Sequence, residues 1–196
     1  MARTSQIREK RRELLPVVAR AFTDLGYRRA TTAQLARRCG VQQNILYRLW
    51  PDKKAMFLAA IEYVYDFAEQ RWLKLLAGDG RDNGATRLLR FESIHHGEFG
   101  QYRILFAGLA ETDDPEIRDC LRRVYRRFHR FIEAQIASHR NRRGRRGTLA
   151  ADLTSWGVIG LGTAINIAKE LDLMDQPERS RALRDVGTAL INLQGK

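Results

Sequence analysis

The chain has 196 residues, enough for one larger domain or for one small and one medium domain. Its formal net charge is +12, and it contains no run of about 18 apolar residues, so we expect no transmembrane helix. The N-terminus lacks the apolar centre of a signal peptide, and Cys39 and Cys120 are the only cysteines. We therefore expect a cytoplasmic protein with two buried or half-buried thiols, although the sequence is also compatible with a disulfide between them.

The positive charge is concentrated in two segments. Residues 1–50 contain 11 Lys and Arg against 3 Asp and Glu, and residues 118–146 contain 11 against 2. The first segment predicts attraction to nucleic-acid phosphates, which would make binding salt-dependent. The second has three interpretations: a solvated helix face followed by a basic loop at residues 140–147, an accessory contact with DNA, or an attraction for an anionic effector.

Nearly the whole chain is predicted to be helical, because apolar residues recur at spacings of three and four and no segment alternates as a strand does. About nine helices are expected, at residues 5–25, 32–39, 43–49, 53–77, 84–96, 99–111, 115–139, 148–172 and 177–194. Gly26 ends the first helix, Asp52 caps the fourth, and Asp114 caps the seventh. The turn-rich residues 78–84 are the best candidate for a domain junction.

Residues 31–50 meet several independent requirements of a helix-turn-helix. Thr31 and Gln34 form a capping box, which begins a helix. Ala36 lies where the two helices touch, and Gly40 falls in the turn, where positive φ is tolerated. The small core between the helices is predicted to consist of Leu35, Cys39, Val41, Leu46 and Leu49.

The second helix of this motif presents a polar outer face, made of Gln42, Gln43, Asn44, Tyr47 and Arg48. Such side chains form hydrogen bonds with base edges or phosphates when a helix lies in the major groove of DNA. An ordinary helical hairpin with a polar face is the alternative. The agreement of cap, small residue, glycine and core spacing favours the DNA-binding motif.

At its N-terminus the chain resembles TetR-family transcriptional regulators. The residues that carry the resemblance are the segment Phe22–Thr31, Leu35-Ala36, Gly40-Val41, Leu46-Tyr47, Trp50-Pro51 and Lys53. The specific match covers residues 7–60, and beyond it the agreement is in helix number, length and order. The resemblance implies an all-α fold with a three-helix DNA-binding domain at residues 1–52. A larger helical domain at residues 53–196 would bind a ligand and dimerise, and the helix at 53–77 would link the two.

The resemblance also implies roles for individual residues. Base contacts are expected from Gln43, Asn44 and Arg48, and a contact with base or phosphate from Gln42. Phosphate contacts are expected from Thr32, Tyr47 and Lys53. The sequence departs from the family at Leu49, where His or Tyr is frequent, which removes one expected phosphate contact. Trp50 replaces the usual Phe in a packing position.

Each of the last two predicted helices carries an apolar stripe. The first stripe consists of Gly157, Gly160 or Leu161, Ala164 and Ala168, and the second of Leu183, Val186, Leu190 and Leu193. In the family, the corresponding helices pair across a two-fold axis as a four-helix bundle. The resemblance therefore implies a homodimer and a near-palindromic operator. Burial of both stripes within one chain is the alternative.

The candidates for an effector-binding site are Phe91, His95, Tyr102, Phe106 and Trp156, although aromatic residues on helices more often belong to the core. The His95-His96 pair lacks the spacing of a zinc site, so no metal is expected. The glycines between Gly157 and Gly162 lie within a helical pattern, which favours helix packing over nucleotide binding. The core position of Cys39 favours packing over redox sensing.

The sequence thus predicts a ligand-responsive, sequence-specific DNA-binding transcriptional regulator, specifically a repressor that a small-molecule effector releases. Its expected partners are a double-stranded DNA operator, a second copy of the chain and an unidentified small molecule. The alternative is a non-specific or architectural nucleic-acid-binding protein driven by its basic charge. An enzyme or carrier is disfavoured, because the sequence contains no nucleophile–base pair, metal-binding set or phosphate-binding loop, and we expect no catalytic residues and no cofactor.

Overall fold

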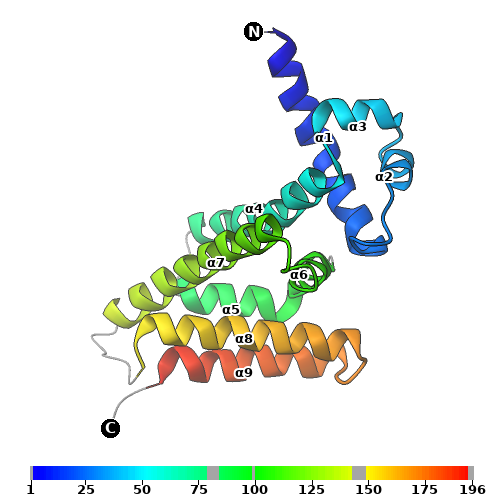
Figure 1. Cartoon of the computed structure of the whole chain (residues 1–196). Coiled ribbons are helices and arrows are strands. Elements are labelled where there is room, and N and C mark those ends of the chain that lie inside the picture. The colour runs from blue at the N-terminus through cyan, green and yellow to red at the C-terminus, as the bar shows by residue number, and fades with distance from the viewer. Residues whose placement is uncertain (1, 79–83, 99, 143–148, 194–196) are drawn as a thin grey trace. The chain divides into compact units, whose positions relative to one another are not determined.

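The computed structural model describes residues 2–78, 84–98, 100–142 and 149–193, and all regular structure within them is helical (Figure 1). The helices are α1 (Ala2–Leu25), α2 (Thr32–Arg38), α3 (Gln43–Leu49), α4 (Lys53–Ala77), α5 (Gly84–His95), α6 (Tyr102–Leu109), α7 (Pro115–Arg142), α8 (Ala151–Glu170) and α9 (Gln176–Asn192). The predicted all-α fold and the order of its helices are confirmed. Parts of the two predicted loops, residues 79–83 and 143–148, lie outside the described residues, as do positions 99 and 194 at predicted helix ends.

Side-chain caps begin several helices where the sequence predicts them. At the start of α4, the Ala55 N–H donates to Asp52 Oδ1 at 2.7 Å. At the start of α7, Asp114 Oδ1 accepts from two backbone N–H groups at 2.9 and 3.3 Å. Asp175 caps α9 in the same way. Each such cap contributes about 0.5–2 kcal/mol, so short local signals set these helix starts.

The chain divides into two compact units, one formed by Met1–Ala68 with Phe99–Val124 and the other by Glu69–Glu98 with Tyr125–Lys196. Helices α4 and α7 therefore each contribute to both units. The division does not coincide with the predicted boundary at residue 52, because α6 and the part of α7 up to Val124 belong with the helix-turn-helix. Ion pairs join them, with Lys54 at 3.2 Å from Asp114 and Arg28 at 2.6 Å from Glu111. The predicted functional division stays a prediction.

The first unit is built around an aromatic cluster and the contact between α2 and α3. The Phe57 ring lies 5.1 Å from that of Phe22 and 4.5 Å from that of Tyr27. Gly40 turns the chain between α2 and α3 with φ +64, as predicted. Of the predicted small core, Leu35, Leu46 and Leu49 are buried, whereas Cys39 and Val41 are half-buried. Leu46 and Leu49 belong to α3, and their burial fixes which face of this helix remains outside.

The second unit is built around α9, which packs against both α5 and α8. Figure 1 shows α8 and α9 side by side. Its core contains Ala85, Leu89, Ile136 and Ile191. Gly187 allows the close approach of α9 to α5, because a Cβ at this position would lie 2.6 Å from Leu89 Cδ2.

The prediction that Arg140 lies in a solvated loop is wrong. This residue belongs to α7, and its side chain is buried. Its guanidinium donates to the Leu149 carbonyl at 2.6 Å, the Thr154 hydroxyl at 2.9 Å and the Ile191 carbonyl at 3.5 Å. A buried charge is costly unless its donors are satisfied. Arg140 thus fastens the end of α7 to the start of α8 and the end of α9.

Candidate nucleic-acid interface

The helix α2 begins with the predicted capping box. The Gln34 N–H donates to Thr31 Oγ1 at 3.2 Å, and the Thr31 N–H donates to Gln34 Oε1 at 2.9 Å. Leu35 and Ala36 follow as the buried residues of this helix. Since the cap fixes the start of α2 and burial fixes its inner face, the position of α3 against it is set by local sequence.

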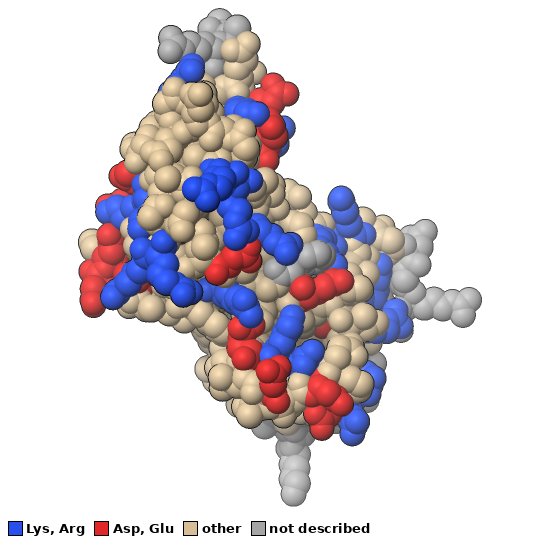
Figure 2. Space-filling view, turned by 90° about the vertical axis from the view of Figure 1, so that its right-hand side faces the viewer, with Lys and Arg blue, Asp and Glu red and all other residues tan. Residues whose placement is uncertain are grey.

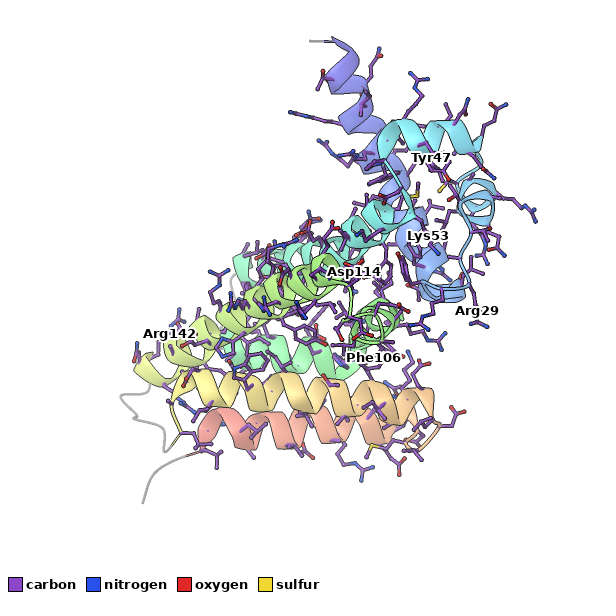
Figure 3. All side chains as sticks on the ribbon, viewed as in Figure 1. Arg29, Tyr47, Lys53, Phe106, Asp114 and Arg142 are labelled. Carbon is purple, nitrogen blue, oxygen red and sulfur yellow. The ribbon has the colours of Figure 1, made fainter. Side chains whose placement is uncertain are left out.

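The outer face of α3 is polar and exposed, as predicted. All five predicted side chains are exposed: Gln42, Gln43, Asn44, Tyr47 and Arg48. Tyr47, labelled in Figure 3, is 49% exposed although it is aromatic. Amide, guanidinium and phenol groups on one helix face offer both donors and acceptors to a partner in water.

Thr32 and Tyr47 are brought together by the turn between α2 and α3. The Tyr47 hydroxyl donates to Thr32 Oγ1 at 3.2 Å. Two residues that the family resemblance links to phosphate therefore form one small hydroxyl cluster beside the outer face of α3.

Lys53 has a structural role that the sequence did not indicate. Its Nζ donates to the carbonyls of Tyr27 and Ala30, both at 3.1 Å. The same ammonium lies 4.6 Å from the centre of the Tyr27 ring. Lys53, labelled in Figure 3, thus connects the start of α4 to the loop before α2. Its predicted phosphate contact stays a prediction.

Basic side chains in this region are partly neutralised by acidic neighbours. Arg38 pairs with Asp24 at 2.9 Å, and Arg28 pairs with Glu111. Arg37 is also exposed. Figure 2 shows Lys and Arg exposed on one face of the molecule, with Asp and Glu beside several of them. Surface ion pairs contribute little stability, so these arginines remain available to attract phosphates.

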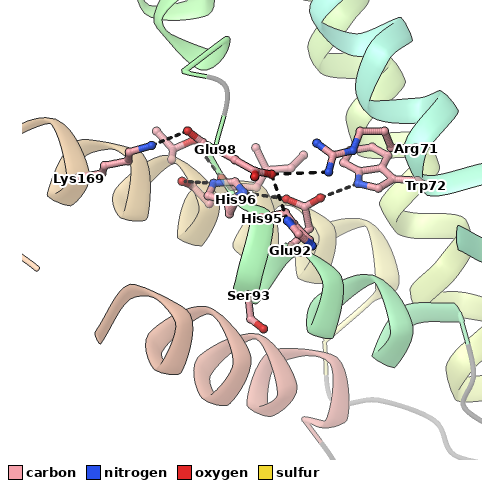
Figure 4. Close-up of polar contacts among 12 residues, drawn as sticks. Arg71, Trp72, Glu92, Ser93, His95, His96, Glu98 and Lys169 are labelled. Carbon is pink, nitrogen blue, oxygen red and sulfur yellow. Dashed lines mark hydrogen bonds and ion pairs between the residues drawn. The ribbon is translucent and has the colours of Figure 1, made fainter. Parts of the chain in front are cut away.

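The second unit contains a polar cluster at the end of α5 (Figure 4). Glu92 accepts a hydrogen bond from Trp72 Nε1 at 2.7 Å, and its other oxygen lies 2.9 Å from His96 Nδ1. His96 Nε2 lies 2.9 Å from the Gly162 carbonyl oxygen. Because both ring nitrogens face acceptors, the arrangement favours an imidazolium that donates two hydrogen bonds. His96 thereby joins α5 to α8.

The charges of this cluster support one another. Burial alone would lower the pKa of His96, but its hydrogen bond with Glu92 and the negative charge of that residue raise the pKa above its ordinary value. Burial opposes ionisation of Glu92 as well, but hydrogen bonds from His96 and Trp72 lower its pKa. Gly162 leaves room for the ring, since a Cβ there would lie 3.1 Å from His96 Cε1. The sequence predicted a functional role for His95 and none for His96. Both histidines have a carboxylate partner at helical spacing, since Glu98 Oε2 lies 3.1 Å from His95 Nδ1.

The five predicted effector-site residues are divided between the two units, and their role stays a prediction. In the second unit, the rings of Phe91 and His95 lie 4.6 Å apart. In the first unit, those of Tyr102 and Phe106 lie 5.7 Å apart. Trp156 on α8 is 48% exposed, and its ring lies 4.9 Å from that of His129 on α7.

An exposed apolar stripe follows the outward side of α8. It consists of Leu153, Trp156, Gly160, Ala164, Ile167 and Leu171, all exposed and spaced by three or four residues. On α9 and just beyond it, Val186 and Leu193 are exposed as well. A continuous apolar stripe in water is typical of a surface that another protein covers. We call these eight residues the α8–α9 stripe.

The α8–α9 stripe overlaps the predicted dimer interface only in part. Ala164, Val186 and Leu193 are exposed, whereas Gly157, Leu161 and Leu190 are half-buried. Ala168 and Leu183 are only 7% and 4% exposed within their own chain, which at these two positions favours the alternative of burial within one chain.

Both cysteines are free thiols, as expected. Burial raises the pKa of Cys39, and burial together with the nearby Glu62 carboxylate raises that of Cys120 to about 11.

Among the helices that the structure describes, none is both long and apolar enough to cross a membrane.

Comparison with known proteins identifies a family and a fold. The family model for bacterial regulatory proteins of the tetR family matches residues 15–60. The chain is 32% identical over 141 residues to the nucleoid occlusion factor SlmA of Citrobacter koseri, a match that covers 70% of this chain and 71% of that protein.

Solved structures show the same fold at lower identity. A TetR-family transcriptional regulator from Rhodococcus sp. is 19% identical with a TM-score of 0.77, covering 91% of this chain and 96% of that one. A transcriptional regulator from Saccharomonospora viridis, solved in complex with choline, is 19% identical with a TM-score of 0.75, covering 96% and 99%.

Proposed function

This chain belongs to the TetR family of bacterial regulatory proteins, and from that premise we propose that it is a sequence-specific repressor that a small-molecule effector releases from its operator. TetR-family proteins are DNA-binding transcriptional regulators. The observation that carries the proposal is the exposed polar face of α3, held outward by the buried leucines on its opposite face.

In this proposal, Gln43, Asn44 and Arg48 read base edges in the major groove. A well-formed bidentate contact discriminates against a wrong base by about 1–3 kcal/mol. Gln42 contacts a base or a phosphate at the start of α3. The hydroxyl cluster of Thr32 and Tyr47, together with Lys53, positions the phosphate backbone, which sets register without reading sequence.

Two copies of the chain would pair through the α8–α9 stripe. Gly160 supports this part of the proposal, because nothing lies within 4 Å of a Cβ built at this position. Gly160 and the nearby Ala164 allow a partner helix to approach closely. A two-fold dimer places two recognition helices about one DNA turn apart, so the operator would be near-palindromic.

The effector would bind among the helices of the second unit. The choline bound to the Saccharomonospora viridis regulator shows that a protein of this fold holds a small molecule. Release from DNA requires only that the effector bind the DNA-free form more tightly than the DNA-bound form. We propose no catalytic role for this unit.

A second candidate function is a nucleoid-associated DNA-binding role. The similarity to nucleoid occlusion factors favours it, as does the formal net charge of +12, which suits widespread contact with DNA. The number and positions of binding sites on the chromosome separate the two functions. A repressor would occupy few sites close to promoters, whereas a nucleoid-associated factor would occupy many dispersed sites.

The first experiment is selection of bound duplexes from a random DNA library at about 0.15 M salt. Enrichment of a near-palindrome supports the sequence-specific dimer and provides a probe for effectors that release it. Binding without enrichment would support the charge-driven alternative. Failure to bind any duplex would contradict both.

A further inference from the structure

The first turns of α1 form an extension that the core does not require. Every residue from Thr4 to Glu13 is exposed or half-buried, and the first core residue of the helix is Leu14, which is 4% exposed. Figure 1 shows these turns continuing beyond α3 toward the N-terminus. Most of the stability of a helix in a protein comes from packing of its apolar face. Because these turns bury little, packing does little to explain why the helix extends this far.

Arg11 anchors the extension to the end of α3. Its Nε donates to the Leu49 carbonyl at 2.7 Å, and its Nη2 donates to the same oxygen. Its guanidinium also lies 5.7 Å from the centre of the Trp50 ring. The last carbonyls of a helix carry partial negative charge, which favours a cation there. The direction of the extension is therefore fixed relative to the helix that presents the polar outer face.

Two arginines of the extension have no partner among the residues that the structure describes. Lys10 is neutralised by Glu13 at 2.8 Å. Arg8 and Arg12 are exposed, and neither side chain has a hydrogen bond or an ion pair to any described residue. Like charges four residues apart destabilise an isolated helix by about 0.2–0.5 kcal/mol. Folding thus gains nothing from this pair, which suits an anionic partner instead.

The spacing of the pair is close to two phosphate steps of a nucleic-acid backbone. Four residues of α-helix rise about 6 Å. Phosphates of one strand of duplex DNA follow one another every 3.4 Å or so along the axis. Two arginines on one side of α1 can therefore reach separate phosphates of the same strand.

We propose that Arg8 and Arg12 make a second contact with duplex DNA, on the phosphates that flank the half-site beside the C-terminal end of α3. This inference rests on the proposed sequence-specific binding of DNA. Because the contact is made by charge, it lengthens the bound site without adding bases that are read. The operator that the protein needs is then longer than the sequence it recognises.

The test combines a double variant with trimmed DNA. Arg8→Gln/Arg12→Gln protein and the wild type are titrated against operator duplexes whose flanks shorten one base pair at a time, at several salt concentrations. The wild type loses affinity as the flanks are removed, whereas the double variant is indifferent to them. The slope of log K against log salt becomes shallower by about 0.9 for each phosphate that the variant no longer neutralises.

Two further variants keep the result interpretable. Arg181→Gln/Arg184→Gln removes two exposed arginines from α9, outside both basic segments, and it retains the flank dependence of the wild type. Arg8→Lys/Arg12→Lys restores the flank dependence, because phosphate attraction needs the charge and not the guanidinium geometry. Restoration by lysine also excludes a loss of helix as the cause, which circular dichroism measures directly.

Several outcomes would overturn the inference. One is a wild type that selects an operator but ignores its flanks, which leaves the proposed function intact. Another is flank dependence that survives in Arg8→Gln/Arg12→Gln, and a third is its disappearance in the α9 control, which would assign the effect to total charge. A wild type that binds all duplexes equally would instead contradict the proposed function itself.

Discussion

The helices α3 and α8 each bury one face in their own unit and present the other to water, yet their outward faces differ in chemistry. On α3 the outward residues are amides, a phenol and a guanidinium, whereas on α8 they are Leu, Ile, Trp, Gly and Ala. The buried faces are both apolar, so they identify the fold and not the partner. In the proposed function, the outward faces differ because their partners differ: DNA for the polar face and a second copy of the chain for the apolar face.

Gly160→Glu places a charge in the apolar outward face of α8, and we expect it to have the largest effect. The new side chain has free space in the single chain, so folding is maintained. In a dimer covered along the α8–α9 stripe, burying an unpaired carboxylate costs several kcal/mol. We expect the dimer dissociation constant to rise at least about 100-fold, since every 1.4 kcal/mol is a factor of ten. Sedimentation equilibrium measures it.

The matched control is Ala134→Glu, which adds the same charge at an exposed position of α7. It leaves the dimer intact if the stripe is the interface. Equal dissociation by both variants, or by neither, would contradict the assignment.

Arg48→Ala removes one side chain from the polar outward face of α3. Loss of a bidentate base contact costs about 1–3 kcal/mol, which corresponds to a roughly 5–150-fold loss of affinity for the selected operator. Affinity for unrelated duplexes falls much less. Competition binding at fixed salt compares this variant with Arg37→Ala on α2, which we expect to lower both affinities equally. The same uniform loss in Arg48→Ala would mean that this residue contacts phosphate only.

His96→Gln tests how much the contacts of His96 with Glu92 and with the Gly162 carbonyl stabilise the second unit. Removing charge-assisted hydrogen bonds destabilises the protein by about 1.5–3 kcal/mol, which urea unfolding near pH 6 detects. Glutamine retains a donor but does not titrate.

The pH dependence follows from the directions of the two pKa shifts. The pKa of His96 is raised, so its contribution is complete below its ordinary value of 6.5 and is lost as pH rises through the raised one. The pKa of Glu92 is lowered, so its contribution is complete above its ordinary value of 4.5 and is lost as pH falls through the lowered one. The wild type should therefore lose more stability than His96→Gln as pH rises above 6.5. Parallel stability curves for the two proteins would contradict the charged pair.

Thiol reactivity provides the smallest expected effect. Because the pKa values of Cys39 and Cys120 are raised, both thiols stay protonated at pH 7.5 and react slowly with iodoacetamide until the protein unfolds. Mass spectrometry follows the modification. Rapid modification of Cys39 in the folded protein, with loss of DNA binding, would favour a redox sensor instead.

The sequence predicted α2 and α3 well because their determinants are local. The capping box at Thr31, the turn at Gly40 and the leucine spacing all lie within 20 residues, and each acts through the nearest helix turn. Arg140 was misassigned because the carbonyl of Ile191, which it helps to satisfy, lies 51 residues away in the chain. No sequence pattern indicates such a pairing.

The interface stripes illustrate a different limit. Periodicity finds the apolar faces of a helix, but it does not say which one is covered by the same chain. Ala168 and Leu183 turn inward, while Trp156, predicted to line the effector site, turns outward. For His95 and His96, the spacing was equally uninformative, because each has a carboxylate three or four residues away, Glu98 and Glu92 respectively. The contact with the Gly162 carbonyl of α8 distinguishes His96, and no local pattern predicts it.

The most direct test of the account is selection from a random duplex library carried out in parallel with wild-type and Gly160→Glu protein. We predict that the wild type enriches a near-palindrome with fixed spacing, and that the variant enriches the same bases as a single half-site. A wild type that enriches only isolated half-sites, or no motif at all, would contradict the claim that α3 reads DNA while the α8–α9 stripe pairs two copies.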